Sequence, residues 1–106
     1  MPAKRKQPDT QEKLVYGIVK KIVDACDPES LLKLGAPKEE YDSLSNLIAS
    51  AVIREGAGGL NRTRLAYILS NAQHYEFHMW TEPAKIHGQH FDIADKLLPL
   101  LPKIRR

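Results

Sequence analysis

The chain has a single cysteine and no long apolar segment, and each shortage excludes a class of protein. Cys26 has no second cysteine with which to form an internal disulfide, so we expect the fold to rely on core packing in a reducing compartment. No apolar run approaches the roughly 20 residues that a membrane-spanning helix needs, and no apolar stretch follows the charged segment from Met1 to Lys6. These features predict a cytoplasmic protein without a membrane partner.

Motifs of catalysis are also missing from the sequence. It has no serine or cysteine in a recognised nucleophile motif and no dinucleotide-binding fingerprint. The run Gly56-Ala57-Gly58-Gly59 lacks the lysine and the serine or threonine that complete a phosphate-binding loop. We therefore expect neither enzymatic activity nor a cofactor.

Helical periodicity is the strongest pattern that the sequence does contain. The 106 residues are 42% apolar and 27% charged, which is typical of one globular domain. Apolar stripes predict helices from about residue 10, 42, 62 and 86, and Asp27-Pro28-Glu29 resembles the start of a further short helix. We predict an all-α, single-domain bundle of four to five helices over residues 9–102, with a disordered basic tail at 1–8 and a second basic tail at 103–106. The predicted core contains Val19, Ile22, Leu47, Ile48, Leu65, Ile68, Leu69 and Leu97.

Charge is unevenly distributed along the chain, whose net charge is +3. Six basic residues lie near the two ends, and without them ten basic and thirteen acidic side chains give the remainder a net charge of −3. Acids gather between Asp24 and Asp42, where only Lys33 and Lys38 offset six carboxyl groups. A negative segment of this kind is suited to a basic protein partner.

The same acids have a structural interpretation and a functional one. Asp27 and Asp42 are suited to cap helices, Glu29 to interact with a helix dipole, and Tyr41 to pack across the turn. Alternatively, the acids that do not cap helices form a negative surface for a basic protein, with Tyr41 as its aromatic anchor. The candidate partner-binding residues are Asp27, Glu29, Glu39, Glu40, Tyr41 and Asp42.

This segment resembles the YugE-like family of small bacterial proteins. Asp27-Pro28, Leu31-Leu32, Gly35-Ala36-Pro37 and Glu39-Glu40-Tyr41-Asp42 are similar to the family's Trp-Asp-Pro and Gly-Ala-Pro-x-Asp-Glu-Tyr elements. Cys26 stands in place of the tryptophan and Glu39 in place of the aspartate. The resemblance, which covers about a quarter of the chain, implies a small helical domain. Similar sequences among proteins thought to neutralise bacterial toxins imply an immunity-type or regulatory role.

Two other functions remain open from the sequence. His74 and His78 have a spacing that can chelate a metal on a helix, but they lack the His-Glu-x-x-His pattern, and we expect no bound metal. The basic tails could instead contact nucleic acid, together with Arg62 and Arg64. If the acidic segment is not the partner surface, the next candidate is the helical stripe of Tyr67, Asn71, His74 and His78.

Overall fold

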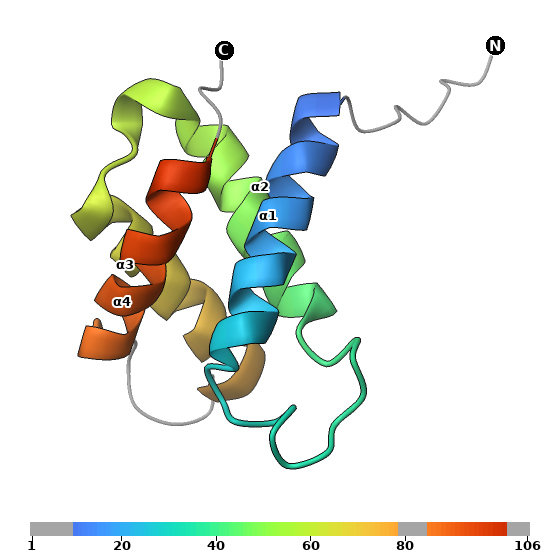
Figure 1. Ribbon diagram of the computed structural model, residues 1–106. Helices are drawn as coiled ribbons and strands as arrows, with labels where there is room; N and C mark the ends of the chain where they lie inside the picture. Colours follow the sequence, from blue (N-terminus) through green and yellow to red (C-terminus); the bar gives the residue numbers. More distant parts are fainter. Residues whose placement is uncertain (1–9, 79–84, 102–106) are drawn as a thin grey trace, which may run out of the picture.

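Four amphipathic segments form the four α-helices of the computed structural model, which describes residues 10–78 and 85–101 (Figure 1). The helices are α1 (Thr10–Cys26), α2 (Asp42–Gly59), α3 (Arg62–Gln73) and α4 (Gly88–Leu97). A π-helical turn, η1 (His74–His78), extends α3, and a 3-10 turn, η2 (Leu98–Leu100), follows α4. No described residue lies in a β-strand, so the predicted all-α bundle is confirmed. The predicted basic tails lie outside the described residues.

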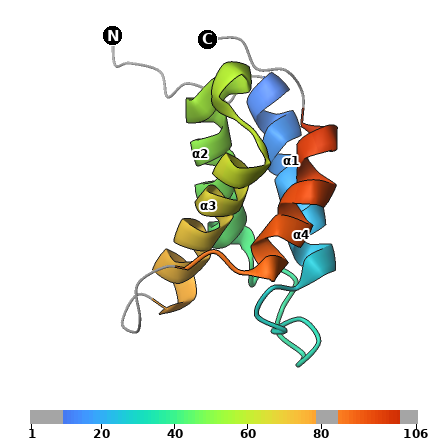
Figure 2. The ribbon, with the colours of Figure 1, turned by 90° about the vertical axis from the view of Figure 1, so that its left-hand side faces the viewer.

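The helices enclose one shared core. Helix α1 packs against α2 and α4, and α3 packs against the same two helices from the other side. In Figure 2, α2 and α3 stand on the left of the bundle and α1 and α4 on the right. Six of the eight predicted core residues are buried, whereas Ile22 and Leu47 are partly buried and pack against the others. None of the helices in the described part of the chain is long and apolar enough to cross a membrane.

The connection between α2 and α3 follows from local sequence. Gly56 has a φ of +71° and interrupts the helical geometry of α2, a backbone conformation that a side chain would disfavour. The Asn61 side chain then accepts a 2.8 Å hydrogen bond from the Arg64 backbone N–H, so Asn61 is the N-cap of α3. This short connection places α3 beside α2.

The predicted short helix after Asp27 does not form. Residues 27–41, all of which the structure describes, make consecutive turns between α1 and α2 and project beyond the lower end of the bundle in Figure 1. Asp27 and Ser30 have φ values of +47° and +59°, which a right-handed helix cannot accommodate. We call this segment the 27–41 loop.

Candidate functional site

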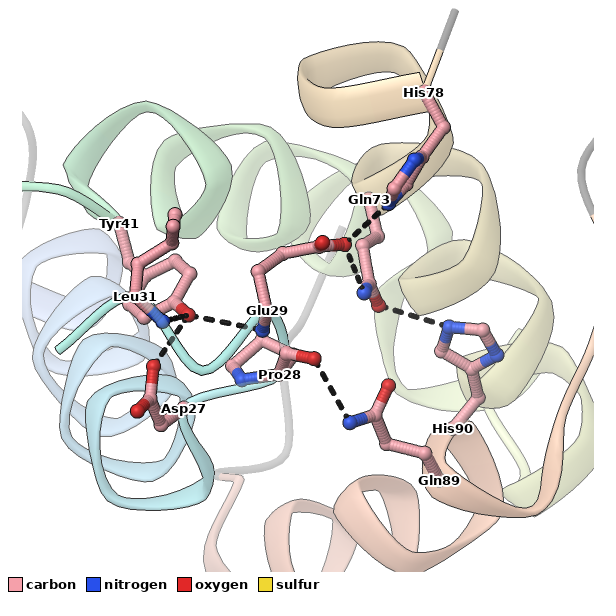
Figure 3. A network of polar contacts seen from close by, with 9 residues as sticks. All are labelled: Asp27, Pro28, Glu29, Leu31, Tyr41, Gln73, His78, Gln89 and His90. Carbon is pink, nitrogen blue, oxygen red and sulfur yellow. Dashed lines mark hydrogen bonds and ion pairs between the residues drawn. The ribbon is translucent and has the colours of Figure 1, made fainter. Parts of the chain in front are cut away.

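Tyr41 is the hub of the 27–41 loop (Figure 3). Its side chain is fully buried, and its ring meets the Phe77 ring edge-on with the centroids 6.0 Å apart. The Tyr41 hydroxyl donates a 2.5 Å hydrogen bond to Asp27 Oδ1. The same oxygen accepts hydrogen bonds from the backbone N–H groups of Glu29, at 2.9 Å, and Leu31, at 3.3 Å. Tyr41 therefore fixes the path of the first turn of the loop.

Asp27 organises the next turn through its carboxylate. Oδ1 accepts a 3.1 Å hydrogen bond from the Leu32 N–H, and Oδ2 accepts one of 2.9 Å from the Lys33 N–H. Burial opposes the charge on this carboxylate, but the hydrogen bonds from Tyr41 and the loop backbone outweigh burial and lower the Asp27 pKa. Asp27 thus remains an ionised acceptor that holds the loop, rather than the N-cap of a helix.

Glu29 joins the loop to the other side of the bundle (Figure 3). Its Oε2 atom accepts hydrogen bonds of 2.6 Å from Gln73 Nε2 at the end of α3 and of 2.6 Å from His78 Nε2 in η1. A further 3.0 Å hydrogen bond runs from Gln89 Nε2 of α4 to the Pro28 carbonyl. These contacts clamp the start of the loop to three elements that are distant in the sequence.

His90 completes the network from α4. Its Nδ1 accepts a 3.0 Å hydrogen bond from the His87 backbone N–H, so the ring proton lies on Nε2, which donates to Gln73 Oε1 at 2.9 Å. Burial, reinforced by the nearby His87, lowers the pKa of His90. A neutral His90 is the form that can make both hydrogen bonds at once.

The tip of the braced loop exposes a large apolar side chain. Leu34 is 80% exposed. Its backbone N–H donates to the Leu31 carbonyl at 3.1 Å, and Gly35, with φ of +100°, donates to the Leu32 carbonyl at 3.0 Å. An irregular loop of this length within a small domain is uncommon unless it serves a function. The hydrogen bonds of the loop keep the Leu34 side chain exposed to water. In this position the side chain contributes no apolar burial to the stability of the isolated protein.

The structure separates the six sequence-selected site residues into two groups. Asp27, Glu29 and Tyr41 are engaged inside the network, and the burial of Tyr41 contradicts its expected role as a surface anchor. Only Glu39 and Glu40 of the six are exposed. They follow Leu34 in the same loop, which also carries the exposed basic side chains of Lys33 and Lys38.

Asp42 is not an N-cap, although the sequence suggested one. Helix α2 begins at Asp42, and the cap position before it is held by Tyr41, without a side-chain cap. Asp42 Oδ1 instead lies 2.7 Å from Lys20 Nζ, which also binds Asp24 at 3.0 Å. The hydrogen bonds to Asp42 and Asp24 raise the pKa of Lys20. Lys20 is one positive charge shared by Asp42 and Asp24, so it offsets one of the six negative charges between Asp24 and Asp42.

Some residues of the two alternative functions also have partners within the fold. His78 binds Glu29 and His90 binds Gln73, and within the described residues no three His, Cys, Asp or Glu side chains lie where they could hold a metal ion. The arginines considered for nucleic acid form ion pairs, Arg62 with Asp95 at 2.7 Å and Arg64 with Glu55 at 2.8 Å.

Comparison of the chain with protein-family models, curated proteins and solved structures gave no match. Sequence reasoning missed Gln73 and Gln89, whose contacts come from distant parts of the chain. The succession Gly35-Ala36-Pro37 was the signal that the chain turns directly after Leu34.

Proposed function

We propose that this chain is a small protein-binding module that presents the tip of the 27–41 loop to a protein partner. The observation that carries the proposal is the 80% exposure of Leu34 on a loop whose backbone is fixed by Tyr41 and Asp27. A loop that is already ordered loses little conformational entropy on binding, so its apolar contact adds more to affinity. Rigid scaffolds commonly carry their binding residues on such loops.

The side chains around Leu34 indicate the chemistry of the partner surface. We infer an apolar pocket that receives Leu34, with basic groups on its rim opposite Glu39 and Glu40 and acceptor groups opposite Lys33 and Lys38. Basic groups on that rim would attract the two exposed acids and orient the complex. The partner surface is therefore still expected to be basic, but only two acidic residues of this chain, Glu39 and Glu40, would contact it. Neutralising or regulating the partner, which the motif resemblance implies, is part of the same proposal.

The polar network favours binding over catalysis. Asp27 and Tyr41 bond to each other and to loop backbone, and Glu29 bonds to Gln73 and His78. Their hydrogen-bonding capacity is used to hold the loop, which is the role expected of side chains that support a recognition surface. A catalytic group must instead reach a substrate.

Site-specific crosslinking in the native cell tests the proposal. A photo-crosslinking residue is placed at Leu34, and in a matched variant at Leu14, an exposed leucine of α1. We expect a discrete protein adduct from position 34 that is absent from position 14. Identical adducts from both positions, or none from position 34, would contradict the proposed contact surface. Nucleic acid recovered at position 34 would favour the nucleic-acid alternative.

A further inference from the structure

The first turn of α4 holds the 27–41 loop by two hydrogen-bonded routes (Figure 3). In the first route, Gln89 Nε2 donates directly to the Pro28 carbonyl at 3.0 Å. In the second route, His90 donates to Gln73, whose Nε2 atom donates in turn to Glu29 Oε2 at 2.6 Å. The position of the start of the loop therefore depends on the geometry of one helical turn.

His90 is the third residue of α4, where a capping box ordinarily carries glutamate or glutamine. Its Nδ1 atom reaches back and accepts a 3.0 Å hydrogen bond from the backbone N–H of His87, the residue before the helix. An imidazole nitrogen accepts such a bond only while it carries no proton. The start of α4 therefore requires a neutral His90 ring, a condition that a glutamine at this position would not impose.

A proton on the His90 ring would remove this acceptor and place a charge where the fold opposes it. Nδ1 would carry a hydrogen that faces the His87 N–H, so two donors would meet. The His90 residue is only 4% exposed, and burial disfavours the charged ring. The positive end of the helix dipole also repels a cation in the first turn. The protonated ring must therefore leave its place, and its contact with Gln73 is lost with it.

The charged and titratable groups around His90 act in both directions. Among the described residues, His87 opposes a proton on the ring and Glu29 favours one, and burial with His87 outweighs Glu29 to lower the His90 pKa. The contact from α3 is the neutral Gln73, and the described parts of α1 and η2, which also pack against α4, add no charge that shifts this pKa. Protonated His78 would bind Glu29 more strongly, but it is 47% exposed, and exposed ion pairs contribute little.

We propose that His90 makes the attachment of the 27–41 loop sensitive to pH. Protonation of its ring from solvent loosens the first turn of α4, and with it the Gln89 and Gln73 contacts that hold the start of the loop. The loop is then less often in the ordered form that binds a protein, so the apparent affinity falls in mildly acidic solution. The effect on binding rests on the proposed function, whereas the release of the loop is a property of the chain alone.

Nuclear magnetic resonance of the full chain tests the release of the loop without a partner. Between about pH 7.5 and about pH 5, the His90 ring is followed together with the Glu29 backbone amide and the Gln73 side-chain amide. We expect both amide signals to shift with the same midpoint as the ring. The amide signal of Val19, in the core of α1, should stay in place and show that the chain remains folded.

Two variants identify the group that titrates. His90→Gln keeps a side chain suited to the capping box but does not titrate, so the Glu29 and Gln73 signals should lose most of their shift. His78→Gln, which removes the other histidine bound to Glu29, should retain the shifts. Shifts of native size in His90→Gln, shifts lost only in His78→Gln, or a His90 ring that stays neutral down to about pH 5 would each overturn the inference.

Photo-crosslinking from position 34 tests the consequence for binding. Adduct yield in cell lysate is measured at about pH 7.5 and about pH 5.5 for chains that carry either the native His90 or His90→Gln. Titration of the partner affects both chains equally, so we expect the yield of the native chain to fall by about twofold or more relative to the variant. An equal fall in both chains would overturn the effect on binding. No adduct at either pH would contradict the proposed function, while the resonance experiment still decides the release of the loop.

Discussion

The Tyr41 hydroxyl donates a 2.5 Å hydrogen bond to the Asp27 carboxylate across 14 positions of the sequence. Burial and the neighbouring carboxylate raise the pKa of Tyr41 to about 12, so its hydroxyl keeps its proton near neutral pH. Hydrogen bonds overcome burial to lower the pKa of Asp27, which keeps the acceptor ionised. Near neutral pH the Tyr41 hydroxyl therefore keeps its proton and the Asp27 carboxylate stays ionised. Their hydrogen bond continues to hold the 27–41 loop at these pH values.

Removing only the Tyr41 hydroxyl should loosen this loop. Tyr41→Phe preserves the buried ring but leaves the N–H groups of Glu29 and Leu31 without that acceptor. We expect the free energy of unfolding to fall by about 1 to 3 kcal/mol. Amide exchange of Glu29 and Leu31 should accelerate more than that of α1. Tyr67→Phe, at an exposed tyrosine, is the control, and equal effects of the two variants on urea unfolding would contradict the role of Tyr41.

Stability should depend on pH through His90. Its pKa is lower in the folded protein than in the unfolded chain, so the unfolded chain takes up the proton first as pH falls. The stabilisation is complete above the unfolded pKa and is lost progressively below it, toward the lower folded pKa. His90→Gln keeps a donor and an acceptor but does not titrate. Between about pH 7.5 and about pH 5.5 the native chain should lose more thermal stability than the variant, and parallel melting curves would refute this.

Replacing Ser45 should not lower the free energy of unfolding, in contrast to the replacement of Tyr41. Its side chain is fully buried in α2, and its Oγ has no hydrogen-bond partner among the described residues. Removing an unsatisfied buried hydroxyl relieves its desolvation cost. Ser45→Ala should leave the free energy of unfolding unchanged or raise it by up to about 1 kcal/mol. A loss of more than about 1 kcal/mol in urea unfolding would mean that the hydroxyl has a partner.

The exposed acids of the loop should act on binding rather than on folding. Replacing Glu39 and Glu40 with lysine reverses two charges that lie on the surface. The unfolding midpoint should therefore stay nearly constant. The double variant should associate more slowly with the partner protein that crosslinking identifies, and its association rate should depend less on salt. Stopped-flow or surface-binding kinetics at two ionic strengths measures both effects. Unchanged kinetics would remove Glu39 and Glu40 from the interface.

The helices were predictable because their signals are local. Apolar residues at helical spacing mark α1, α2, α3 and α4, and the capping function of Asn61 is decided within three residues of sequence. Core burial follows from the same stripes. Six predicted core positions, among them Leu65 and Leu97, are buried in the structure.

The loop was not predictable from the same kind of signal. Asp27-Pro28-Glu29 has the composition of a helix start, yet Asp27 adopts a positive φ and bonds to Tyr41, 14 positions later. Glu29 contacts Gln73 across 44 positions and His78 across 49, and no periodic pattern carries such information. The acidic surface was overestimated for the same reason, since Asp27, Glu29 and Asp42 bond to residues 14, 44 and 22 positions away.

The central claim is that the braced tip of the 27–41 loop is the partner-binding surface. Its most direct test is calorimetric titration of the partner protein that crosslinking identifies. The titrants are the variants Leu34→Asp and Leu14→Asp, which place the same charge at two exposed leucines. Both variants should keep the native unfolding midpoint. Leu34→Asp should weaken binding by about tenfold or more, and Leu14→Asp should bind as the native chain does. Equal affinities of the two variants for the partner would contradict the claim.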